Sequence, residues 1–104
     1  MSDQNLTTGS RRFSLGRVLA TPGALEVLAD SGQSPPYFLD RHVRGDCGDV
    51  DQEDWQLNDH ALKDGSRILS AYKTLKGVKI WIITEAADDD DKRAATTLLL
   101  PAEY

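Results

Sequence analysis

Cys47, His42 and His60 are the residues of this chain that could form a nucleophile and its base. Cys47 lies in a segment rich in glycine and aspartate, five residues after His42 and thirteen before His60. A cysteine becomes a nucleophile when a neighbouring histidine or cation stabilises its thiolate. The residues around Cys47 are carboxylates, which disfavour a thiolate. We therefore predict no catalytic residue here, and a single cysteine allows neither an internal disulfide nor a cysteine-based metal site.

Acidic residues are dense between Asp46 and Asp64, where seven carboxylates stand against one base, Lys63. Carboxylates at this density could bind Ca²⁺ or Mg²⁺. The EF-hand order fails, because counting from Asp49 the sixth residue is Asp54 rather than Gly and the twelfth is His60 rather than Glu. We predict no metal site and no cofactor, and we interpret the segment as a capped helix with a solvated acidic face. The residues of this face that we expect to bind a partner are Asp49, Asp51, Glu53 and Asp54.

Three β-prone runs separated by turn-forming residues make up the last third of the chain. They span residues 67–74, 78–85 and 95–100. This order predicts an antiparallel meander, with Gly77 in the first hairpin turn.

The central run of this meander has two different faces. Lys79, Trp81, Ile83 and Glu85 alternate with Val78, Ile80, Ile82 and Thr84, so each set lies on one side of the strand. If the Ile80 side packs on helices, Lys79, Trp81 and Glu85 form an exposed patch suited to binding. The alternative is that helices or a partner cover both faces.

Two helix starts are marked by a capping residue followed by proline, at Thr21-Pro22 and Ser34-Pro35. Gly32 and Gly45 are placed to end these helices, and Asp51 begins a third helix that ends at Gly65. The expected fold is α+β, with three short helices packed on an antiparallel sheet of three to four strands. The sheet combines an N-terminal strand within 13–20 with the meander. Residues 1–12 are predicted to be a disordered tail, and residues 13–104 a single domain.

Length and charge exclude several classes of protein. The chain has 104 residues and a net charge of −5, which argues against a general nucleic-acid binder because a phosphate backbone requires a basic surface. No run approaches the roughly 20 apolar residues that span a bilayer, and the first residues lack the order of a signal peptide. We expect a cytoplasmic protein without membrane association.

Five segments of the sequence, at residues 15–25, 32–35, 41–46, 67–72 and 79–86, carry a resemblance to known proteins. Together they resemble a family of small bacterial proteins carried on plasmids and other mobile elements. Members of this family are largely described as plasmid-related or hypothetical, so the resemblance implies a genetic context and no catalytic residue. The chain departs from the family pattern at Cys47, where relatives often have Trp, and in the acidic loop 88–91, which is usually shorter. Neither position is therefore expected to belong to a shared site.

Three functions remain open at this stage. We expect a non-enzymatic accessory protein of a mobile element that binds a protein of host defence or DNA processing, through Trp81 and its neighbours or through the acidic face. The first alternative is a toxin-like ribonuclease on the meander face. Its candidates for an acid–base pair and a cation are Arg67, Tyr72, Lys79, Glu85 and Arg93. The second alternative is a structural homodimer in which the edge formed by 95–100 pairs with a second copy.

Overall fold

The computed structural model describes residues 13–46, 48, 56, 58, 61, 64–90 and 92–104. The elements of this part are, in chain order, β1 (Arg17–Ala20), α1 (Pro22–Asp30), α2 (Pro35–Val43), β2 (Ile68–Lys73), β3 (Lys79–Thr84), β4 (Ala95–Leu99) and the 3₁₀ helix η1 (Pro101–Glu103). The fold is α+β, as predicted. No helix among these residues has the length and apolar character needed to cross a membrane.

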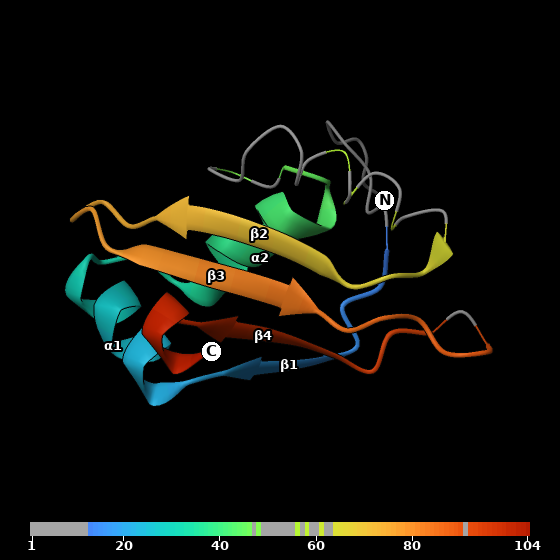
Figure 1. Cartoon of the computed structure of the whole chain (residues 1–104). Coiled ribbons are helices and arrows are strands. Elements are labelled where there is room, and N and C mark those ends of the chain that lie inside the picture. Colours follow the sequence, from blue (N-terminus) through green and yellow to red (C-terminus); the bar gives the residue numbers. More distant parts are fainter. Residues whose placement is uncertain are drawn as a thin grey trace, which may run out of the picture.

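The four strands form one sheet in the order β1-β4-β3-β2. The meander is confirmed, because β2 pairs with β3 and β3 with β4 in antiparallel fashion. The prediction of an entirely antiparallel sheet is wrong, since β1 pairs with β4 in parallel. The chain between β1 and β2 carries α1 and α2 across one face of the sheet instead of turning back as a hairpin. β1 and β2 consequently run in the same direction, and so does β4 (Figure 1).

The position of β4 corrects the homodimer hypothesis. β4 lies between β1 and β3, so residues 95–100 are interior to the sheet and offer no free edge. The edge strands are β1 and β2.

Helices α1 and α2 begin where the sequence predicts. Thr21 accepts a hydrogen bond from the Ala24 amide at 3.1 Å, and Pro22 occupies the first turn of α1. In α2, Pro35 takes the same position, although the Ser34 side chain makes no capping bond. The two helices lie behind the sheet in Figure 1, and η1 lies in front of it.

The core fills the space between these helices and the sheet. Ile80 and Ile82 are fully buried in it, so this side of β3, which the sequence left open, is the one that packs on the helices. The Phe38 and Tyr72 rings are in contact, with centroids 5.4 Å apart. Burying such side chains supplies most of the folding free energy of a small domain.

The outer edge of β2 is covered by parts of the chain that precede it. The Asn58 side-chain amide makes the two hydrogen bonds to Leu69 that a neighbouring strand would make. Its Nδ2 donates to the Leu69 carbonyl at 2.6 Å, and its Oδ1 accepts from the Leu69 backbone amide at 3.1 Å. Gly48 forms a parallel bridge with Ala71. A side chain at Gly48 would collide with the Ala71 carbonyl, at 2.1 Å from an added Cβ.

The predicted third helix lies largely outside the described residues, which include only two α-helices. Gln56, Asn58, Ala61 and Asp64 are described and have helical conformation. The bounds of this helix stay a prediction. The predicted tail 1–12 and Cys47 also lie outside the described residues.

Candidate functional site

The face of the sheet opposite the helices, here called the outer face, carries the patch that the sequence predicts. Lys79, Trp81 and Glu85 all lie on it, and Lys79 and Glu85 are exposed. No helix layer of the described residues covers this face. At the centre of this face Ala71, Ile83 and Leu99 are buried, so the part of the outer face that a partner can reach is formed by the exposed residues around them, Arg67, Lys73, Lys79 and Glu85.

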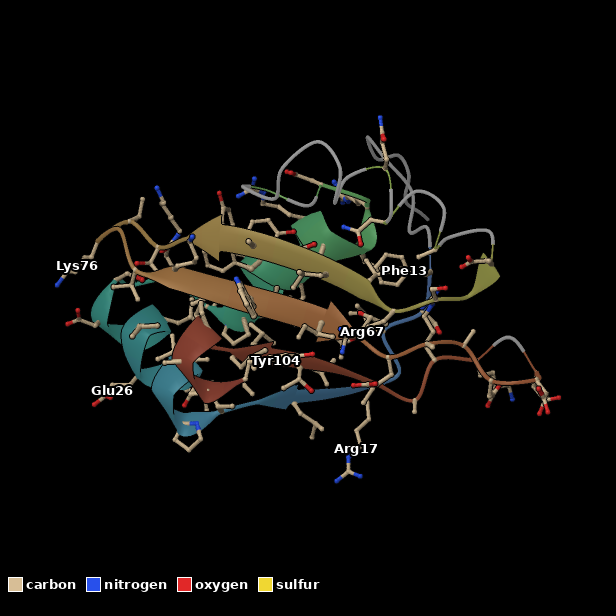
Figure 2. The ribbon with its side chains drawn as sticks, viewed as in Figure 1. Phe13, Arg17, Glu26, Arg67, Lys76 and Tyr104 are labelled. Carbon is tan, nitrogen blue, oxygen red and sulfur yellow. The ribbon has the colours of Figure 1, made fainter. Side chains whose placement is uncertain are left out.

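Trp81 is half-buried, because the last residues of the chain fold back over it. The Tyr104 ring meets it edge to face, with centroids 5.7 Å apart. Arg67 donates from Nη1 to the Tyr104 hydroxyl at 2.8 Å, and its guanidinium carbon lies 5.8 Å from the ring centroid. Figure 2 shows Tyr104 and Arg67 side by side in front of the sheet. Helices or a partner were the cover expected for Trp81 if both faces of the strand were buried, whereas the ring in contact with it is the chain's own Tyr104.

Tyr104 is held in place by Glu103 at the start of α1. The Glu103 carboxylate accepts from the Thr21 hydroxyl at 2.5 Å and from the Leu100 amide at 2.8 Å, and these bonds lower its pKa. A carboxylate near a helix N-terminus is also favoured by the helix dipole. Gly23 gives this carboxylate room, since an added Cβ would lie 2.6 Å from its Oε2. A proline followed two residues later by glutamate, at Pro101 and Glu103, is the one sequence signal that could have revealed this turn.

Positive charge collects on the outer face although the chain is acidic overall. Lys73 and Lys79 stand directly opposite each other in the β2–β3 ladder, and both are exposed. Like charges in directly opposite positions destabilise a sheet unless an anion neutralises them. Arg67 and Arg17 also lie on this side of the sheet, and among the described residues Glu85 and Glu103 are acidic residues on the same side.

The residues proposed for a ribonuclease do not meet at one point. Tyr72 lies on the helix side and donates its hydroxyl to the Asp46 carbonyl. Arg93 is buried and donates to backbone carbonyls, including those of Ser66 at 2.7 Å and Ala61 at 3.1 Å. Lys79 and Glu85 share the outer face but are six residues apart on an extended strand, which separates them by about 20 Å. Such a distance is too long for an acid and a base acting on one phosphate.

Of the acidic segment from Asp46 to Asp64, the carboxylates of Asp46 and Asp64 belong to the described part of the chain. Asp64 accepts a hydrogen bond from the Ser66 amide at 2.9 Å. The Asp46 carboxylate binds Arg41 Nε at 2.8 Å and accepts from the Gly48 amide at 3.1 Å, and both bonds lower its pKa. The remaining predicted contact residues, Asp49, Asp51, Glu53 and Asp54, lie outside the described residues. Within the described segments, His, Cys, Asp and Glu form no group of three that could hold a metal ion.

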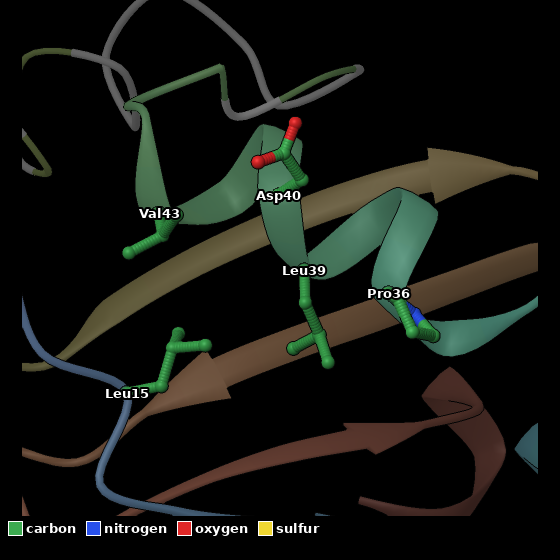
Figure 3. Close-up of a pocket in the computed structure, with 5 residues that line it drawn as sticks. All are labelled: Leu15, Pro36, Leu39, Asp40 and Val43. Atoms are coloured by element: carbon green, nitrogen blue, oxygen red, sulfur yellow. The ribbon is translucent and has the colours of Figure 1, made fainter. Parts of the chain in front are cut away.

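A small apolar cavity of about 280 Å³ lies between α2 and the chain that leads into β1. Figure 3 shows Leu39 reaching toward Leu15 while the Asp40 carboxylate points the opposite way. Asp40 pairs with Arg44 at 3.2 Å. The cavity therefore lacks the convergent polar groups that orient a small ligand or a substrate.

His42 lies at the centre of a buried chain of polar groups. Its Nδ1 is 2.5 Å from the Ser70 hydroxyl, and its Nε2 is 2.8 Å from the Thr84 hydroxyl. The Thr84 and Thr96 hydroxyl oxygens are hydrogen-bonded at 2.7 Å, and the Thr96 hydroxyl donates to the Leu15 carbonyl at 2.7 Å. All four side chains are fully buried, so this serine–histidine contact has no access to a substrate.

The donor and the acceptor of each hydrogen bond in this network follow from the single proton that each hydroxyl can donate. Thr96 gives its proton to Leu15, so Thr84 must donate to Thr96 and accept from His42. His42 then carries its proton on Nε2, and its Nδ1 accepts from Ser70. Burial, with the nearby charge of Arg93, lowers the pKa of His42 to about 3 and keeps the ring neutral. The network joins α2, β2, β3, β4 and the segment before β1.

Comparisons of the chain with protein-family models, with curated proteins and with solved structures found no match. The function is therefore argued from the geometry of this chain.

Replacing Thr96 by Val should destabilise the fold, because it removes the side-chain donor to the Leu15 carbonyl and leaves the buried Thr84 hydroxyl proton without an acceptor. We expect a loss of about 1–3 kcal/mol in the free energy of unfolding, measured by urea titration. Thr97→Val is the matched control, since Thr97 is the next residue on the outer face, and its effect should stay within about 0.5 kcal/mol. Equal effects of the two substitutions would contradict the network.

The neutral His42 should make the protein less stable in mild acid. The unfolded chain takes up a proton near pH 6.5, whereas folded His42 does so only near pH 3. Stability is therefore complete above pH 6.5 and falls as the pH is lowered toward 3, by ~2 kcal/mol at pH 5. In native protein, nitrogen NMR shifts should show His42 as the Nε2–H tautomer without titration from pH 7.5 to 5.

His42→Gln should remove most of the slope of stability against pH in this range, and His60→Gln should keep it. A native His42 that titrates near pH 6 would contradict the buried neutral ring.

Tyr104→Ala should expose Trp81 to solvent. We expect stronger acrylamide quenching of Trp81 fluorescence in a Trp55→Phe background, where Trp81 is the only tryptophan. Tyr37→Ala, which removes another exposed tyrosine on α2, should leave the quenching unchanged. Unaltered quenching in Tyr104→Ala would show that Tyr104 does not cover Trp81.

Proposed function

We propose that this chain is a non-enzymatic protein-binding module whose outer face binds an acidic surface of another protein. The observation that carries the proposal is the row of Arg67, Tyr104 and Trp81 beside the paired Lys73 and Lys79, on the sheet face opposite α1 and α2. Trp, Tyr and Arg are the residues that most often dominate the energy of protein interfaces.

The charges of the outer face support an anionic partner. The opposed Lys73 and Lys79 repel each other in the isolated chain, and a carboxylate placed between them would remove this cost. Arg67 already holds Tyr104, so its guanidinium is oriented before binding, which reduces the entropy lost on association.

The dimensions of the patch support a macromolecular partner. Lys79 and Glu85 mark its ends along β3, about 20 Å apart. A flat surface of this length fits a protein interface better than a small ligand, which usually needs a concave site.

The resemblance to plasmid and mobile-element proteins suggests the kind of partner. An accessory protein of such an element would act on a protein of the host, in defence or in DNA processing. The non-enzymatic interpretation is supported by the places of His42, Ser70, Tyr72 and Arg93, whose polar groups are all bonded within the fold.

Capture experiments with matched variants test this function. Immobilised wild-type protein should retain a stoichiometric protein from a host extract, and raised salt should release it because the contact is charged. Tyr104→Ala and Lys79→Glu should each lose this protein. Tyr37→Ala should retain it, since Tyr37 is similarly exposed but lies on α2. Retention by Tyr104→Ala and Lys79→Glu, or capture of RNA in place of a protein, would overturn the proposal.

A further inference from the structure

The two edges of the sheet differ in their cover. Asn58 and Gly48 occupy the backbone groups along β2. β1 is the other edge, and no described segment lies beyond it (Figure 1). Exposed edges of this kind are templates for pairing with another strand, and they are usually protected by charged residues or prolines. β1 contains no lysine or proline, and its one charged residue, Arg17, stands at its first position.

The backbone of β1 is divided between the sheet and the free edge. The Arg17 and Thr21 amides donate to Ala94 and Leu98, each at 3.0 Å. In an extended strand, alternate residues point the same way, so the amides and carbonyls of Val18 and Ala20 point outward from the sheet.

The side chains at this edge are apolar. Val18 is 46% exposed and Leu19 is 42% exposed, on opposite faces of the sheet. When another strand covers such an edge, it forms hydrogen bonds with the outward backbone groups and removes the apolar side chains from water. Both effects favour pairing.

We propose that a second copy of this chain pairs with β1 in antiparallel fashion, about a two-fold axis at Leu19. Val18 then exchanges two backbone hydrogen bonds with the partner's Ala20, and the symmetry repeats them. The two Leu19 side chains face each other in a non-hydrogen-bonded pair. The two sheets join into one.

Charge complementarity favours a second copy over an unrelated strand. In this register Arg17 stands opposite the partner's Thr21, and within each chain the Thr21 hydroxyl binds the Glu103 carboxylate. Arg17 makes no ion pair with any described residue, and Figure 2 shows it extending beyond the β1 edge. Glu103 is exposed and has lone pairs left for another donor. The dimer therefore gains two Arg17–Glu103 ion pairs.

This pairing uses the edge of the sheet and leaves the outer face accessible. The dimer is thus independent of the proposed binding function, and either can fail alone. In the dimer, the two outer faces lie on the same side of one continuous sheet.

Light scattering on size-exclusion fractions, over a wide range of protein concentration, tests the pairing. Wild type should shift from monomer to dimer as the concentration rises. Leu19→Lys should stay monomeric at every concentration, because two ammonium groups would face each other on the axis. Leu25→Lys is the control, since Leu25 is 48% exposed on α1 and away from this edge, and it should dimerise like wild type. A monomeric wild type, or a dimer that Leu19→Lys leaves intact, would overturn the proposal.

A disulfide cross-link checks the register. Facing residues of a non-hydrogen-bonded pair have Cα atoms about 4.5 Å apart, within the range that a disulfide spans. Leu19→Cys, in a Cys47→Ser background, should form a covalent dimer under mild oxidation much faster than Leu25→Cys in the same background. Equal rates for the two cysteines would contradict the two-fold axis at Leu19.

Discussion

The buried polar chain from Ser70 through His42, Thr84 and Thr96 to the Leu15 carbonyl is the constraint that orders the rest of the fold. Apolar packing tolerates small sliding movements between a helix and a sheet, whereas a hydrogen bond is lost within a fraction of an ångström. Because every donor in this hydrogen-bonded network has one acceptor, the network is satisfied in one register of α2 on the sheet. The last of these bonds also ties the segment before β1 to β4, through Thr96 and the Leu15 carbonyl.

This constraint decides which surface is left for a partner. Once His42 holds α2 on the Ile80 side of β3, α1 and α2 both lie on that side, and among the elements with described bounds η1 lies on the opposite side. The short turn from Leu100 to Tyr104 is too small to cover a sheet. It can position one aromatic ring, and Glu103 at the start of α1 determines where that ring lies. The last residues of the protein therefore orient the Trp81 ring on β3.

The sequence predicted local features well and long-range ones poorly. The helix starts at Thr21 and Ser34 and the division of β3 into two faces depend on neighbours within a few residues, so composition and periodicity reveal them. Which of the two faces packs on the helices was left open by the sequence. The direction of β1 depends on how two helices cross the sheet, which no local pattern encodes. Tyr104 contacts Trp81, and Arg93 donates to the Ser66 and Ala61 carbonyls. These contacts join residues that are distant in the chain, so the spacing of residues in the sequence does not reveal them. Of the predicted binding residues, Lys79, Trp81 and Glu85 do share a face, because alternation along one strand is a local property.

Net charge also misleads when it is read for the whole chain. A value of −5 argues against anionic partners only if the charges are mixed evenly over the surface, since binding depends on the local field. Here Arg17, Arg67, Lys73 and Lys79 lie on the outer side of the sheet, and the Asp88–Asp90 turn projects beyond its end. An acidic chain can thus present a basic face. For the acidic partner proposed above, the local positive charge would attract it, while the carboxylates elsewhere on the chain would repel an extended polyanion such as nucleic acid.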